Sequence, residues 1–175
     1  RRGLPNLSNT VDALEHYSDP DVMNVFLRHG ILSEREILSR QEILLDTYAK
    51  DIEIEGATLL DLVRGKVLPP CRAAQAQACD LVLKTKKAGI EPDEEMKNLQ
   101  TIRGHVTSME KAVGQLEEAI AKVKGIEGPL ERAKGARDQI LPLMGKIRED
   151  SDALEAIVDD KLWELPKYSE LLWVH

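Results

Sequence analysis

The stretch LQTIRGHVTSMEKAVGQLEEAIAKV, residues Leu99–Val123, decides the fold of this chain. Apolar residues recur in it at alternating spacings of three and four, which is the pattern of a coiled-coil helix. Four heptads follow one another without interruption, and at 1.5 Å per residue they make a helix about 40 Å long. The a positions are Leu99, Val106, Val113 and Ile120, and the d positions are Ile102, Met109, Leu116 and Val123.

A second helical pattern follows after a short loop, Gly125–Pro129. Long helices joined by such a loop are antiparallel neighbours. We therefore predict an antiparallel, coiled-coil-like helical hairpin over residues 92–160, with a kink at Pro142. The second apolar stripe is Leu130, Ala133, Ile140, Met144, Ile147, Leu154 and Val158.

The preceding residues also predict helices. Residues 1–32 form a lead-in with short helices at Val11–Tyr17 and after Asp19-Pro20, the second ending at Gly30. Ser33 and Glu36 make a capping box, which opens a long helix over 33–89. The alternation at 51–55 also fits a strand, but it is too short and has no partner, so we predict helix there. Pro69-Pro70 should kink or break this helix.

Composition supports an all-α helical bundle in a single domain over residues 1–175. Aromatic residues are 3% and charged residues 31% of the chain, which favours helices over a β-sandwich. The net charge of −7 argues against a nucleic-acid partner. No apolar run is long enough for a membrane span. Because Cys71 and Cys79 lie about 12 Å apart along one helix, they cannot form a disulfide and indicate a reduced, cytoplasmic protein.

The end of the chain differs in kind. Residues 161–175 interrupt the helical pattern with a proline and hold three of the chain's six aromatic residues. We predict a short irregular aromatic tail that packs on its own domain or docks on another surface. The residues of this packing or interface tail are Trp163, Tyr168, Leu171, Leu172 and Trp173.

No catalytic, cofactor-binding or metal-binding residue is predicted. Motifs for phosphate binding, zinc binding and nucleophilic catalysis are missing, and the four histidines are scattered. The lysines at 84, 86 and 87 suit the negative end of a helix better than a phosphate site. Glu53 and Glu55 face different ways on a helix, and we expect solvent around both.

Several stretches in order resemble the C-terminal region of type III glutamine synthetases. They are LPN (4–6), NTVDAL (9–14), HGILSERE (29–36), RQEILL (40–45), IEIE (52–55), VLP (67–69), ILP (140–142) and LWELPKYSELL (162–172). The resemblance covers nearly the whole chain and is weakest in the heptads. The chain departs from the family at Leu7-Ser8, an insertion, at Gly56, where a helix former is expected, and at Pro70, which doubles a single proline.

The resemblance implies a fragment of a longer enzyme, as does the start at Arg1-Arg2-Gly3. That enzyme joins ammonia to glutamate using ATP and Mg or Mn, as a double-ring homo-oligomer. None of the family's catalytic motifs matches here, so the resemblance implies a non-catalytic domain that contacts the catalytic domain and neighbouring subunits. Two alternatives stay open: an independent helical coiled-coil interaction module, and a helical enzyme whose site is assembled from scattered residues.

Overall fold

The computed structural model describes residues 3 and 5–171, apart from the side chains of residues 168 and 169. Helices make up most of this part, and none of its residues forms a strand. The predicted all-α class is therefore confirmed. No helix in this part is long and apolar enough to cross a bilayer.

The chain forms two compact units, each built from two segments. Unit 1 comprises Arg1–Gly56 and Ala119–Pro142, and unit 2 comprises Ala57–Glu118 and Leu143–His175. The single domain over residues 1–175 stays a prediction.

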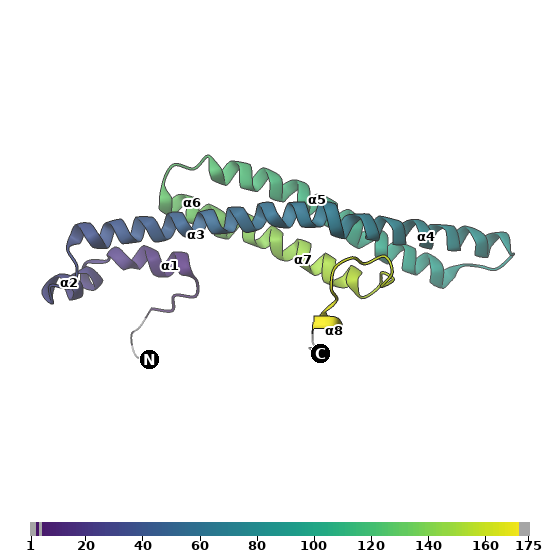
Figure 1. The fold of residues 1–175 in the computed structure, drawn as a ribbon, viewed down its shortest axis with the longest axis horizontal. Coiled ribbons are helices and arrows are strands. Elements are labelled where there is room, and N and C mark those ends of the chain that lie inside the picture. The colour runs from purple at the N-terminus through teal and green to yellow at the C-terminus, as the bar shows by residue number, and fades with distance from the viewer. Residues whose placement is uncertain (1–2, 4, 172–175) are drawn as a thin grey trace. The chain divides into compact units, whose positions relative to one another are not determined.

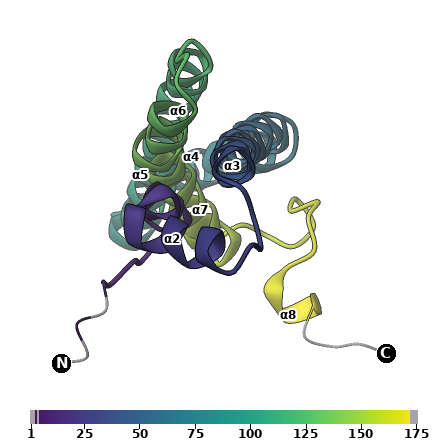
Figure 2. The same ribbon diagram turned by 90° about the vertical axis from the view of Figure 1, so that its left-hand side faces the viewer.

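Unit 1 begins with the short helical segments α1 (Thr10–Glu15), η1 (His16–Ser18, a 3₁₀ turn) and α2 (Pro20–Arg28). The side chain of Asn9 caps α1 by accepting a hydrogen bond from the Asp12 backbone N–H at 2.9 Å. Gly30 ends α2 with a left-handed φ of +61°, as its place in the sequence predicts. Figure 2 shows α2 and the connection that leads from it into α3.

The capping box at the start of α3 (Glu34–Leu62) is confirmed. The Ser33 backbone N–H and hydroxyl donate to one oxygen of Glu36 at 2.8 and 2.7 Å. Asp19 differs from the prediction, because its side chain makes no hydrogen bond to the start of α2. Its carboxylate instead accepts a hydrogen bond from Nδ1 of His16 at 2.7 Å.

The core of unit 1 joins α1 and α3 to α6 (Pro129–Gly135). Val11, Leu45 and Ala133 form a buried cluster, one residue from each helix, and Figure 1 shows α1 alongside α3. Gly56, the unexpected residue of α3, is buried beside this core. A Cβ there would lie 3.0 Å from Cδ1 of Ile120, so a small residue lets the helices approach closely.

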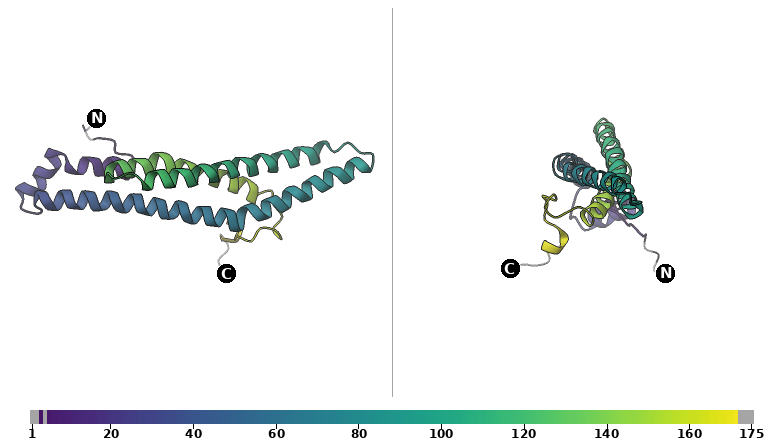
Figure 3. Two further views of the ribbon diagram at one scale, coloured as in Figure 1. Left: turned by 90° about the horizontal axis from the view of Figure 1, so that it is seen from above. Right: turned by 90° about the vertical axis from the view of Figure 1, so that its right-hand side faces the viewer.

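Unit 2 contains two long helices joined by a turn, α4 (Leu68–Lys87) and the first part of α5 (Asp93–Lys124). Figures 1 and 3 show them side by side with the turn at their ends. Gly89 in this turn has a φ of +80°, and three lysines occupy the last turn of α4. Arg72 crosses from α4 to α5 and donates to Glu110 at 2.7 Å.

All the heptad positions of α5 are buried except Leu99, which is half-buried. The residues after the predicted loop form α6, η3 (Ala136–Ile140) and α7 (Leu141–Glu155). In unit 2, His105 on α5 contacts Asp150 on α7 at 2.9 Å. In unit 1, a Cβ on Gly135 of α6 would lie 3.3 Å from Val123 of α5. These contacts support the hairpin, whose coiled-coil packing stays a prediction.

The prolines do not break the helices. The sequence predicts a kink or a break at Pro69-Pro70. There is no break, because helical residues run without interruption from α3 through η2 (Val63–Val67) into α4, and the kink stays a prediction. Both η2 and η3 are π turns, and each ends directly before a Leu-Pro pair. The sequences VRGKVLP (63–69) and ARDQILP (136–142) share Arg, Leu and Pro in register. In an α-helix the proline ring clashes with the carbonyl four residues earlier, and a wider turn relieves this clash.

Candidate functional site

The described residues do not offer a metal site. No group of three or more His, Cys, Asp or Glu side chains converges among residues 3 and 5–171. Cys71 is buried and Cys79 is exposed, and both are free thiols, as the spacing predicts. Burial raises the pKa of the Cys71 thiol to about 11, so this thiol is protonated and unreactive at neutral pH.

The two carboxylates that the sequence places in solvent have different surroundings. Glu55 is exposed as expected, but Glu53 is only 4% exposed, so the prediction for Glu53 is wrong. Arg132 of α6 donates from Nε and Nη2 to the two oxygens of Glu53, both at 2.8 Å. This bidentate pair compensates the buried charge. It is a packing element of unit 1 rather than a site open to a substrate.

A second buried carboxylate, Asp150 of α7, was not singled out from the sequence. It is 3% exposed and accepts a hydrogen bond from Nδ1 of His105 at 2.9 Å, with Lys146 at 3.5 Å. Burial alone would raise the pKa of Asp150, but hydrogen bonds from His105 and Ser108 outweigh it and the pKa lies below its ordinary value. The heptad register places His105 next to a buried position, which is the one signal that could have found this pair.

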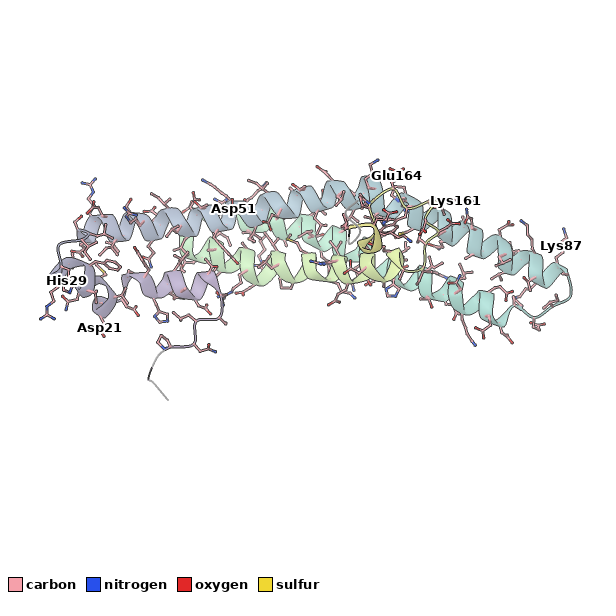
Figure 4. All side chains as sticks on the ribbon, turned by 60° about the horizontal axis from the view of Figure 1, so that its bottom comes forward. Asp21, His29, Asp51, Lys87, Lys161 and Glu164 are labelled. Carbon is pink, nitrogen blue, oxygen red and sulfur yellow. The ribbon has the colours of Figure 1, made fainter. Side chains whose placement is uncertain are left out.

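The first residues of the aromatic tail contact other residues of unit 2. Trp163 is only 7% exposed. Next to it, Glu164 forms an ion pair with Lys66 of the π turn η2, with 2.5 Å between Nζ and Oε2. Figure 4 labels Glu164 and Lys161 in this segment. Lys167 adds a hydrogen bond to the Val158 carbonyl at 3.1 Å. The first half of the tail therefore packs on its own unit.

The other predicted tail residues are not brought together with Trp163 in the described part. Leu171, in the short helix α8 (Tyr168–Leu171), is 62% exposed. The side chain of Tyr168, and all of Leu172 and Trp173, lie outside what the structure describes. The docking role of these four residues stays a prediction.

Unit 1 carries a surface that sequence reasoning missed. None of the residues of α2 is buried, although the helix is strongly amphipathic. An open hollow of about 570 Å³ lies at the start of α3. It is lined by Tyr17, whose ring contacts Phe26 of α2, and by Arg35, Glu36, Ser39, Arg40, Ile43 and Leu44 of α3. The sequence marks Ile43 and Leu44 as apolar, but it does not show that they stay uncovered. We call this set the α2–α3 surface: Val22, Val25, Leu27, Ile31, Ile43 and Leu44, all exposed.

Arginines surround the α2–α3 surface. Arg35 and Arg40 line the hollow, and Arg28 occupies the last turn of α2. None of these three side chains forms an ion pair with a described residue. Elsewhere in the described chain, Arg64, Arg72, Arg132, Arg137 and Arg148 all pair with carboxylates.

Comparison with known proteins finds similarity to glutamine synthetases. The family "Glutamine synthetase C-terminal domain" matches residues 1–86, which include the α2–α3 surface. The type-3 glutamine synthetase of Dictyostelium discoideum is 35% identical over 99% of this chain, and the glutamine synthetase of Butyrivibrio fibrisolvens is 32% identical over 99%. The glutamine synthetase of Bacteroides fragilis is 29% identical over the same share.

The chain covers only 24–25% of the length of each of these relatives. The match nevertheless extends along nearly the whole chain, and the resemblance expected from the sequence stretches is confirmed. Residues 1–86 therefore match the glutamine synthetase C-terminal domain family, and the chain as a whole is similar to a part of these glutamine synthetases.

Proposed function

We propose that this chain is the non-catalytic helical C-terminal domain of a type III glutamine synthetase and that it supports the assembly of that enzyme. The observation that carries the proposal is the extent of the match. It includes 99% of this chain but 24% of the type-3 relative. A helical domain with no convergent cluster of metal ligands in its described part suits a supporting role.

The parent enzyme, on this proposal, works in the cytoplasm and joins ammonia to glutamate with ATP and Mg or Mn. Its catalytic groups lie in the part of the polypeptide outside this chain. The domain formed by this chain contacts the catalytic part of the enzyme and neighbouring subunits of a double-ring homo-oligomer. The independent coiled-coil module considered from the sequence is not favoured, since the relatives that match the chain along its length are glutamine synthetases.

The isolated chain tests the non-catalytic role. We expect no heat of Mg-ATP binding in calorimetry and no glutamine formed from glutamate, ammonia and Mg-ATP. The reason is that the described residues present neither a phosphate-binding loop nor a carboxylate cluster. Micromolar Mg-ATP binding by this chain would refute the proposal.

Deletion of the domain from the full-length enzyme tests the supporting role. We expect the truncated enzyme to lose its native oligomeric mass, measured by light scattering after size-exclusion chromatography, and to lose glutamine synthesis with it. A truncated enzyme that stays fully assembled and active would show that the domain does not support assembly.

A further inference from the structure

Part of the apolar stripe of helix α2 is exposed in the described chain. Val22, Val25 and Leu27 are all exposed, with Val25 at 55%. The apolar stripe of an amphipathic helix normally packs against another element, because exposed apolar area is unfavourable in water. Met23 and Phe26 of the same helix are half-buried, and the Phe26 ring lies 6.1 Å from the ring of Tyr17, so only part of the apolar stripe is covered by the described residues.

The start of α3 also exposes apolar residues. Ile43 and Leu44 are exposed on the wall of the 570 Å³ hollow, and Ile31 is exposed in the connection between the helices. A contiguous apolar hollow of this kind marks an interaction site more often than an isolated exposed residue does. Figure 4 shows the location, with Asp21 and His29 labelled at the two ends of α2.

The charges around the hollow indicate the chemistry of the partner. Arg35 and Arg40 line the hollow and form no ion pair with a described residue, and Arg28 ends α2 nearby. Glu36 also lines the hollow, but its carboxylate accepts hydrogen bonds from the backbone N–H and hydroxyl of Ser33. Arginine is enriched in protein interfaces, where it pairs with carboxylates as they lose water. An apolar ridge flanked by Asp or Glu would fit both the hollow and its rim.

We propose that the α2–α3 surface is the interface by which this domain docks on the catalytic part of its own polypeptide, which supplies the apolar ridge and its acidic rim. The inference rests on the proposed function. The relatives are about four times as long as this chain, so a large folded body is tethered to it. A tethered partner has a high effective concentration, which favours it over a free protein.

Hydrogen exchange of the α2 amides tests the proposal in the full-length enzyme and in the isolated chain. We expect α2 to exchange at least about tenfold more slowly in the full-length enzyme, since the docked helix opens less often. Val25→Asp should remove this protection because it places a charge in the apolar contact. The double variant Arg35→Glu and Arg40→Glu should also remove it, because like charges would then face each other.

Matched controls lie in unit 2. Leu83 is as exposed as the residues of the surface, at 61%, and Arg103 forms no ion pair among the described residues. Leu83→Asp and Arg103→Glu should leave the protection of α2 unchanged. Measuring each surface variant in the isolated chain as well separates loss of docking from any change in the intrinsic stability of α2.

Cross-linking identifies the occupant. A photoreactive maleimide on Ile31→Cys, in a Cys79→Ser background of the full-length enzyme, should cross-link residue 31 to the catalytic part of the same chain. Mass spectrometry of the digested one-chain product would identify the linked peptides. A product with the mass of two chains would overturn the proposal, because the occupant would then be a neighbouring subunit or a second copy of the domain. Slower α2 exchange at higher concentration of the isolated chain would also overturn it, in favour of a second copy.

The two proposals fail separately. If deletion of the domain abolishes assembly while α2 exchanges equally fast in both forms, this inference is wrong and the supporting role stands. If α2 is protected in the full-length enzyme but the truncated enzyme assembles normally, the supporting role is wrong and the docking surface stands.

Discussion

Glu53 and Arg132 are the clearest case of a single side-chain pair that holds elements of unit 1 together. The pair links α3 and α6 across 79 residues of sequence, and both hydrogen bonds are 2.8 Å long. Such a pair gains little over an apolar contact of the same volume, but breaking it leaves an uncompensated buried charge.

We therefore expect Arg132→Met to lower the free energy of unfolding by about 3–5 kcal/mol in urea denaturation. The double variant Glu53→Leu and Arg132→Met should recover most of that loss. As a control, Lys97→Met removes an exposed pair with Glu94 and should cost at most about 1 kcal/mol. Equal losses in the single and double variants would show that the charge of Glu53 is not the cause.

Asp150 makes the stability of unit 2 depend on acid. Its pKa lies below the ordinary value in the folded protein, where burial is outweighed by His105, Ser108 and Lys146. A lowered folded pKa stabilises the protein above the unfolded pKa, about 3.9, and this contribution is lost as the pH falls through the folded value.

We expect the difference in melting temperature between the parent chain and Asp150→Asn to be constant above about pH 5 and to shrink below about pH 4. The measurement is a series of thermal melts between these values and lower pH. His105→Gln, which keeps a hydrogen-bond donor without a positive charge, should reduce the difference but keep its direction. A difference that widens in acid would contradict the assigned direction.

At the scale of the helix, the heptad stripe of α5 is the main apolar element. Val113 and Leu116 are both buried and both belong to unit 2. An aspartate at either position would place an unpaired charge in an apolar environment.

We expect Val113→Asp or Leu116→Asp to lower the free energy of unfolding by about 3 kcal/mol or more. Gln115→Asp, at an exposed position of the same helix, is the matched control and should change stability by less than about 0.5 kcal/mol. Circular dichroism melts of the three variants make the comparison. A Val113 or Leu116 variant that melts with the parent would show that the stripe is not a core.

The two π turns belong to the same scale. Each widens a helix one residue ahead of a Leu-Pro pair, and each carries an arginine that reaches a carboxylate on another helix. Arg64 pairs with Glu117 in unit 2, and Arg137 pairs with Asp12 in unit 1. In each of these seven-residue stretches, the widened turn accommodates the proline, and the arginine ties the turn to a neighbouring helix.

At the scale of the whole molecule, the tail connects the end of the chain to unit 2. Trp163 is buried, and Glu164 and Lys167 hold the segment beside η2 and Val158. Burying a large apolar side chain contributes about 1.5–3 kcal/mol.

Truncation after Asp160 should therefore lower the melting temperature of the chain by several degrees, at about 2–4 °C per kcal/mol. Truncation after Lys167 keeps Trp163 and both anchoring residues, and it should retain most of the parent's melting temperature. Thermal melts of the two truncated chains test this. If the shorter chain melts with the parent, the tail does not stabilise unit 2.

The sequence by itself determined the helical class, the buried stripe of α5, the capping box of α3 and the glycine that ends α2. Each of these depends on residues within a few turns of one another, where the 3.6-residue period and local hydrogen bonds act directly. The order of short sequence stretches also indicated the family, although no single stretch was diagnostic.

Only the tertiary structure decided which charged residues are buried and which apolar residues stay exposed. Glu53 pairs with Arg132, and His105 pairs with Asp150. Both contacts depend on how helices far apart in the sequence are aligned along one another. The helix continues through Pro69 because a π turn precedes it. The usual expectation that proline breaks a helix assumes the narrower turn of a regular α-helix. The α2–α3 surface is apolar in the sequence, but its exposure depends on which elements pack around α2, and no pattern within α2 itself contains that information.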